Sequence, residues 1–335
     1  MKKGAPARAP FFFPASRRRV ITRTDSMSRS PRLTVRALIA TSLALAGLVV
    51  ALSTSLEAAP APRRAAPARI EPTPAALAHA MADRRIVLLG EVHDNAAQHA
   101  LRIAALEKLV ASGRRPALAF EQFDRERQPD IDRARRERPR DPDYLIATAS
   151  DDTGWDWRFY RPYVTLALDH DLPIVAANLS RRDAMRVAVE GWPAVFDAAS
   201  IRELGLQALP AELQRKQERA IAIGHCNLLP PDALLPRARA QIARDIVMAR
   251  AIGGSGARGV VLLAGNGHVR RDIGVPAWLP PEDRRHSVSI GLLEAADDAS
   301  APAPGSFDFF ALTEAAKRDD PCEELAKRKA PDAIR

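Results

Sequence analysis

Two runs of branched apolar residues, each ending at a glycine with a histidine close behind it, most constrain how this chain can fold. Residues 85–89 lead into the turn Gly90–His93, and residues 259–264 lead into the turn Gly265–His268. Such runs are typical of strands buried on both faces of a parallel sheet. Ligand-binding loops gather at the ends of these strands. We therefore expect the two turns, together with the separate pair Gly224-His225, to carry function.

Further apolar runs indicate the rest of the sheet. Strands are expected at residues 116–120, 173–177, 288–293 and 307–312, with helical periodicity between most of them. This alternation predicts an α/β domain, a three-layer sandwich with a largely parallel central sheet. The last two strands lack a clear helix between them, so they could pair antiparallel and make the sheet mixed.

Charge is distributed unevenly along the 335 residues. The formal net charge of +9 is carried entirely by the first 36 residues, and the rest of the chain is balanced. A balanced body lacks the basic surface that nucleic-acid binding requires, so we expect no nucleic-acid partner.

The N-terminal region has the order of a targeting segment. Residues 1–59 form a basic leader that includes an uncharged stretch and then small residues, as in a secretory signal peptide or an N-terminal anchor, and Met27 is an alternative start to Met1. We expect export to the periplasm or cell envelope of a bacterium, with membrane contact only through this segment if it is not cleaved. A Pro/Ala-rich linker is expected at 60–80, the folded domain at 81–315 and a charged, frayed tail at 316–335.

The chain contains two cysteines, Cys226 and Cys322. In an oxidising compartment they could form a disulfide that holds the tail beside the Gly224-His225 turn. Sequence separation does not decide between this bond and two free thiols.

Polar side chains follow the predicted strands where the strands end. Carboxylates and imidazoles that converge at one sheet edge suit a divalent cation such as manganese or zinc, or acid–base chemistry. The candidate metal ligands are Glu91, His93, Glu121 and His268, and Asn266 joins them as a candidate catalytic residue.

An aromatic cluster occupies residues 155–163, where Tyr160 and Tyr163 alternate with Arg158 and Arg161. Such clusters are more often core than cofactor site, but the mixture with charged residues resembles a pocket rim or an interface more than a core. A tyrosinate can ligate haem iron.

An ordered series of motifs resembles one known family, the haem-binding ChaN proteins of the Tiki, TraB and erythromycin-esterase-like superfamily. The resemblance extends from about residue 85 to 293. The matching segments are Leu88–Asn95 with His99, Glu121–Arg125 with Gln128, Trp157–Pro162, Ala177–Ser180, Gly224–Cys226, Gln241 with Arg244 and Asp245, and Gly265–Asp272 with Gly274–Pro276. Some members are lipoproteins, and this chain lacks the lipid-attachment cysteine behind its leader.

The resemblance implies an exported haem-binding protein linked to haem or iron uptake, with a possible homodimer and stacked porphyrins. Haem would lie against the aromatic cluster, with Tyr160 or Tyr163 as iron ligand and Arg158 or Arg161 near a propionate. His93, His225 or His268 could instead supply an axial nitrogen.

The alternative function is a metal-dependent esterase or peptidase, as in relatives outside ChaN. Glu91, His93, Glu121 and His268 would then hold a metal that activates water, and Asn266 would orient a substrate carbonyl.

Overall fold

The computed structural model describes residues 65–150, 154–253, 258–295, 301–320, 322–323 and 325–326. The leader predicted at residues 1–59 lies outside this range. Within the range, no helix combines the length and the apolar character that crossing a bilayer would require.

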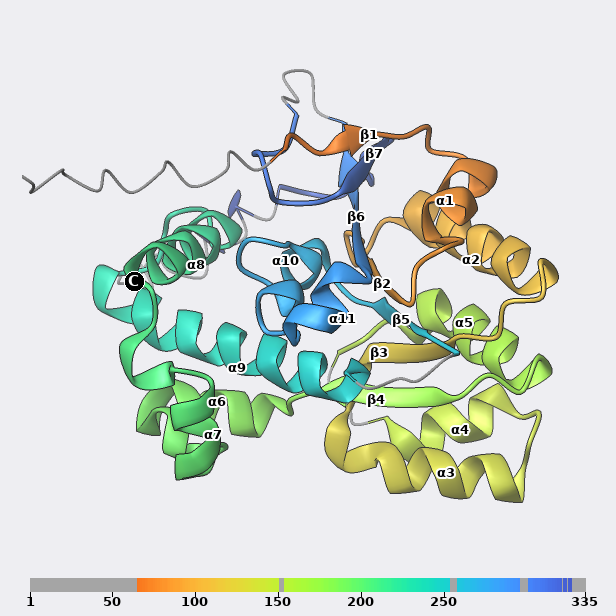
Figure 1. Cartoon of the computed structure of the whole chain (residues 1–335), viewed down its shortest axis with the longest axis horizontal. Helices are drawn as coiled ribbons and strands as arrows, with labels where there is room; N and C mark the ends of the chain where they lie inside the picture. Colours follow the sequence, from red (N-terminus) through yellow and green to blue (C-terminus); the bar gives the residue numbers. More distant parts are fainter. Residues whose placement is uncertain are drawn as a thin grey trace, which may run out of the picture. The chain divides into compact units, whose positions relative to one another are not determined.

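Seven strands and a series of helices alternate along the described residues (Figure 1). The strands are β1 (Ala68–Arg69), β2 (Ile86–Leu89), β3 (Ala117–Asp124), β4 (Ile174–Asn178), β5 (Val260–Leu263), β6 (Ser287–Glu294) and β7 (Phe309–Thr313). The helices are α1 (Pro74–Met81), α2 (Ala96–Ala111), α3 (Gln128–Glu137), α4 (Pro142–Ala149), α5 (Trp157–Asp169), α6 (Arg181–Glu190), α7 (Ala198–Glu203), α8 (Ala211–Gly224), α9 (Leu234–Ile252), α10 (Asn266–Val269) and α11 (Pro281–Arg285).

The strands form one sheet in the order β1-β7-β6-β2-β5-β3-β4, and every pairing is parallel. The antiparallel option for the last two strands is wrong, because the register advances in the same direction from Ile290 beside Phe309 to Glu294 beside Thr313. Because β6 and β7 are parallel, the connection between them leads from the carboxyl end of β6 to the amino end of β7, and such a connection does not have to contain a helix. The expected α/β fold is confirmed.

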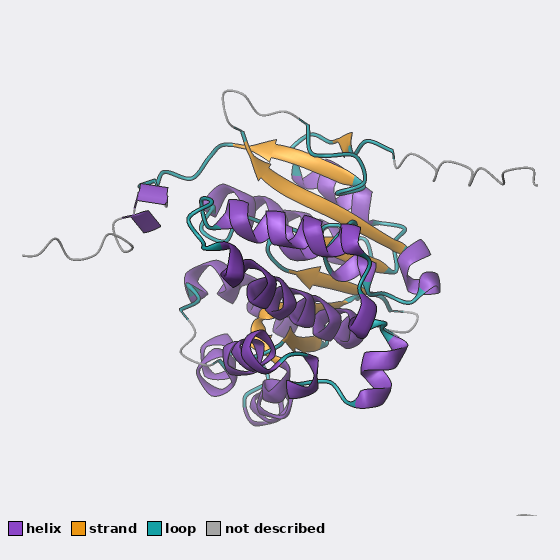
Figure 2. Cartoon of the chain, turned by 90° about the vertical axis from the view of Figure 1, so that its left-hand side faces the viewer, coloured by secondary structure: helices purple, strands orange, loops and turns teal. Residues whose placement is uncertain are grey.

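Helices cover both faces of the sheet, which gives three layers. Val87 and Leu89 of β2 face a core shared with α1, α2 and α5, whereas Ile86 and Leu88 face α9. This alternation follows from the period of two in a strand, and it explains why every residue of β2 is apolar. Figure 1 shows α2 and α5 on one side of the sheet and α9 on the other, and Figure 2 shows a layer of helices in front of the strands.

Regular structure begins earlier than the sequence indicates. The predicted linker at 60–80 contains β1, which pairs with β7, and most of α1. Leu77 and Met81 of α1 are fully buried in the core, and the side chain of Thr73 caps the helix. The alanines that suggest a linker therefore belong in part to a packed helix.

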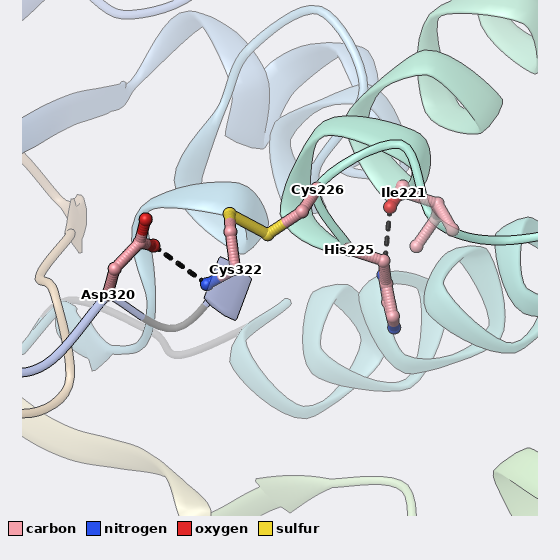
Figure 3. The surroundings of a disulfide bond; sticks show 5 residues. All are labelled: Ile221, His225, Cys226, Asp320 and Cys322. Carbon is pink, nitrogen blue, oxygen red and sulfur yellow. Dashed lines mark hydrogen bonds between the residues drawn. A yellow bond between two sulfur atoms is a disulfide. The ribbon is translucent and has the colours of Figure 1, made fainter. Parts of the chain in front are cut away.

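The two cysteines are joined. A disulfide connects Cys226, just after α8, with Cys322 in the tail (Figure 3). The tail predicted to fray is therefore attached to the domain.

Candidate functional site

The turns after β2 and β5 pack directly against each other at the carboxyl edge of the sheet. A Cβ on Gly90 would lie 2.3 Å from Oδ1 of Asn266, and a Cβ on Gly265 would lie 2.8 Å from the His93 ring. The backbone N–H of Asn266 donates to the Glu91 carbonyl at 2.9 Å. Close approach therefore requires glycine at Gly90, and at Gly265 the neighbour that limits a larger residue is the side chain of His93.

A buried ion pair lies beneath these turns. The side chains of Glu91 and Arg102, from α2, are both inaccessible to solvent, and the guanidinium contacts Oε2 of the carboxylate. The Tyr160 hydroxyl donates to Oε1 at 2.7 Å, and Nδ1 of His93 lies 3.1 Å from the same oxygen. A second guanidinium N–H donates to the Leu89 carbonyl at 3.0 Å. Arg102 thus connects the carboxylate to the end of β2.

His93 is the exposed member of this group. Its side chain is 46% exposed, while the Glu91 side chain below it is fully buried. An ionised carboxylate only accepts hydrogen bonds, so Nδ1 is the ring nitrogen of His93 that donates to it, and Nε2 is the nitrogen left for another partner. Trp155 contacts the ring edge-on with centroids 5.0 Å apart. Nε2 of His99, which is buried against Phe159, lies 2.9 Å from the His93 carbonyl.

A second charged cluster surrounds His268. Its Nδ1 lies 2.6 Å from Asp245 of α9, and its Nε2 lies 3.2 Å from Glu121 of β3. Burial opposes the imidazolium, but the two carboxylates outweigh it and raise the pKa of His268 to about 10. Glu121 also accepts the Gly265 N–H at 2.8 Å.

The pKa values of the two carboxylates in this cluster are shifted in opposite directions. Burial raises the pKa of Asp245 to about 6 against the pull of His268. Burial also acts to raise the pKa of Glu121, but the charge and hydrogen bond of His268, together with His93 and the Gly265 N–H, hold it well below the usual range. His268 is therefore a buried cation between carboxylates, while Glu121 links the cluster to the turn under His93.

The tyrosines lie in the core rather than at a pocket rim. Tyr160 and Tyr163 are 1% and 0% exposed. The Tyr163 hydroxyl donates to the His99 carbonyl at 3.1 Å, and burial raises the pKa of both phenols. Neither oxygen can reach a haem iron in this conformation, and burial disfavours the tyrosinate.

The two arginines of the aromatic cluster lie on the surface. Arg158 is well exposed and pairs with Asp156, and Arg161 forms two hydrogen bonds with Asp143. Both remain candidate partners of an anionic group.

The two other predicted residues have local structural contacts. His225 ends α8, with Nδ1 2.8 Å from the Ile221 carbonyl, and no hydrogen bond or ion pair found among the described residues joins it to His93 or His268 (Figure 3). The Asn266 amide is held on both sides by the Leu292 backbone, at 2.6 and 3.2 Å. These two hydrogen bonds to β6 leave the Asn266 side chain poorly placed to orient a substrate, contrary to the sequence hypothesis.

The predicted metal ligands separate into two groups with their own partners. Arg102 and Tyr160 engage Glu91, and protonated His268 engages Glu121. A cationic imidazole has no lone pair to offer a metal. Over the described residues no group of three or more His, Cys, Asp or Glu side chains is arranged to hold a metal ion. The metal-dependent hydrolase therefore receives no support.

Two cavities among the described residues do not include His93. A cavity of about 710 Å³ lies between α8 and residues 271–308, and one of about 420 Å³ adjoins α10. Neither is lined by Glu91, His93, Glu121 or His268. Asn266 lines the second of these cavities, and Arg161 lines a further cavity of about 490 Å³ beside α5.

Arg102 is the main site residue that sequence reasoning missed. It lies on the buried stripe of α2 with Ala105, Leu106 and Leu109. An arginine on an apolar stripe needs a buried acceptor, because burying an unpaired charge is costly. That signal could have identified the partner of Glu91.

Comparisons with known proteins agree with this fold. A family model described as haem-binding uptake, Tiki superfamily, ChaN matches residues 77–279, more than half of the chain. A search of curated proteins finds no match. The solved structure of ChaN of Campylobacter jejuni, which describes cofacial haem binding, aligns with a TM-score of 0.54 and 20% identity. The alignment covers 70% of this chain and 89% of that one.

Two more distant structures also align. A type III effector gives a TM-score of 0.41 and 14% identity over 76% of this chain and 99% of its own. A mutant erythromycin esterase in an open conformation gives 0.38 and 14% over 76% and 81%. These likenesses carry no functional argument.

Proposed function

Because this chain belongs to the ChaN family of haem-binding proteins in the Tiki superfamily, we propose that it binds haem at the edge formed by the β2 and β5 turns, with Nε2 of His93 as the iron ligand. The observation that carries this assignment is the half-exposed imidazole whose Nδ1 is held by a fully buried carboxylate. When one ring nitrogen of a histidine binds a metal, a hydrogen bond from the other ring nitrogen to a carboxylate fixes the tautomer and orientation of the ring.

The residues around His93 fit a porphyrin in other respects. Haem supplies an iron with an open axial position and a broad apolar ring with two propionates. Trp155 offers an aromatic wall beside the imidazole. Arg158 is exposed on the adjoining turn of α5, where it would pair with a propionate in place of Asp156. Buried Glu91 and Arg102 would keep the His93 ring in position.

A hemin titration tests this proposal. Wild-type protein at micromolar hemin should give a shifted Soret band, and His93→Ala should weaken hemin affinity by about tenfold or more and change the spectrum. Tyr160→Phe should give the same Soret band as wild type, because Tyr160 contacts Glu91 rather than the iron. His286→Ala is the matched control, since that imidazole is exposed and pairs with Glu282 on α11.

Gly265→Ala probes the position of His93 without changing its chemistry. The added methyl group would push the half-exposed imidazole away from its hydrogen bond with Glu91, so hemin affinity should fall while stability changes little. An unshifted Soret band in wild type would overturn haem binding, and an unchanged spectrum in His93→Ala would overturn the ligand assignment.

We also propose that the protein acts outside the cytoplasm, in haem or iron uptake. The Cys226–Cys322 disulfide supports this, because such bonds persist mainly in oxidising compartments. The basic and apolar composition of residues 1–59 supports export. Fractionation of cells that express the full chain, with mass spectrometry of its N-terminus, tests both location and cleavage.

A further inference from the structure

A segment of the tail crosses the carboxyl edge of the sheet next to His93. We call residues 314–320 together with Cys322 the C-terminal strap. It begins at the end of β7, where the Glu314 carbonyl accepts from Asn95 at 2.9 Å and the Ala316 N–H donates to Glu294 at 2.8 Å. It ends at the disulfide with Cys226 (Figure 3). The strap therefore connects β7, the end of β6, the turn after β2 and the end of α8.

Arg318 is the central contact of the strap. Its guanidinium forms hydrogen bonds with both oxygens of Asp94, at 2.7 and 2.8 Å, and with both oxygens of Glu294. Asp94 is the residue immediately after His93. The hydrogen bonds from Arg318 lower the pKa of Glu294 to about 2, and this single guanidinium is the positive charge placed between the two acidic side chains.

Little apolar surface holds the strap. Most of its residues are exposed, including Glu314, Lys317 and Asp320. Exposed or half-exposed ion pairs contribute little to stability and are screened by salt. The disulfide is the one covalent attachment of the strap beyond β7 among the described residues. Without it, local opening of the strap costs much less than unfolding the domain.

We propose that the Cys226–Cys322 disulfide holds the strap beside the proposed haem site at His93, so that reduction of the disulfide frees the strap and speeds haem release. This inference rests on the proposed haem site at His93. A dithiol reductant supplies two electrons and two protons, the S–S bond breaks into two thiols, and the dithiol leaves as its own disulfide. The freed strap withdraws the positive charge of Arg318 from beside Asp94 and Glu294. Haem propionates are anionic, so these carboxylates repel them.

The first arm of the test follows the strap itself. Full-length protein is reduced with dithiothreitol, alkylated with iodoacetamide and desalted, then compared with the oxidised form by hydrogen–deuterium exchange. Peptides over 314–320 should lose protection severalfold, while those over β2 and β5 stay unchanged. A Cys226→Ser, Cys322→Ser double variant should match the reduced form without treatment. Equal protection of the strap in the oxidised and reduced forms overturns this role of the disulfide.

The second arm follows haem transfer to apomyoglobin. Transfer should be severalfold faster from the reduced and double-serine proteins. It should also be faster from oxidised Arg318→Gln, whose disulfide is intact. Arg285→Gln, an exposed arginine that pairs with Glu282 on α11, is the control and should transfer at the wild-type rate. Equal transfer rates in the oxidised and reduced forms overturn the haem part. If oxidised wild type binds no hemin, the proposed function and the claim about haem release are both overturned. The hydrogen–deuterium exchange experiment then still tests whether the disulfide holds the strap closed.

Discussion

Replacing Arg102 with methionine is expected to lower the free energy of unfolding by about 3–5 kcal/mol, the usual cost of removing one partner from a buried ion pair. The variant keeps a long apolar side chain but leaves the Glu91 carboxylate buried without its cation. It also removes the hydrogen bond to the Leu89 carbonyl. Urea unfolding of oxidised wild type and variant, compared by midpoint and slope, measures the loss.

A double variant separates the pair from simple packing. Glu91→Gln removes the charge that Arg102 leaves behind, so adding it to Arg102→Met should recover part of the lost stability. Arg158→Met is the surface control, because its ion pair with Asp156 is solvent-exposed, and it should leave stability almost unchanged. A loss below about 1 kcal/mol in Arg102→Met would show that Glu91 does not depend on this cation.

The same pair shows what sequence could and could not reveal about the site. The sequence singles out the glycines of the β2 and β5 turns for function, and the structure shows that a Cβ at Gly90 or Gly265 would closely approach the opposite turn. Gly224 has no neighbour within 4 Å of such a Cβ. The third glycine–histidine pair has the same residues but ends a helix, and this difference depends on tertiary contacts that no local spacing encodes.

The tyrosines illustrate a second limit. Residue type makes Tyr160 and Tyr163 plausible iron ligands, but their positions on α5 turn both toward the core. An aromatic run is compatible with either side of a helix until its partners are known. Trp155, which precedes α5, contacts His93 from outside that core. The sequence located the aromatic cluster but not the different contacts of its members, since Trp155 contacts the His93 ring and Tyr160 reaches the buried Glu91 carboxylate.

The fold was more predictable than the site because it follows from a repeating pattern. Strands such as β2 and β5 are apolar at every position, which requires cover on both faces. β1 escaped notice because its two residues are exposed and carry no pattern. The parallel pairing of β6 and β7 escaped notice because the connection between them does not have to be a helix.

The His268 cluster predicts that the protein loses stability in mild alkali. A group whose pKa is raised on folding stabilises the folded state fully below its unfolded pKa, and this contribution is lost as the pH rises through the folded pKa. For His268 the window runs from about 6.5 to about 10. Unfolding free energy should therefore fall by roughly 3 kcal/mol between pH 7 and 9.5. Asp245 has its titration midpoint near pH 6 and is mostly ionised at pH 7, and the depressed pKa of Glu121 places its effect in acid, so both contribute little to this window.

Two variants test the assignment of this pH dependence. His268→Gln leaves two carboxylates without their cation and should be less stable at pH 7, but its unfolding free energy should vary much less between pH 7 and 9.5. Glu121→Gln removes one of the anions that raise the pKa of His268, so the loss should begin at lower pH than in wild type. NMR titration of the His268 ring protons reads the same pKa directly. A wild-type stability that stays constant from pH 7 to 9.5 would contradict a protonated His268, because burial alone would favour the neutral imidazole.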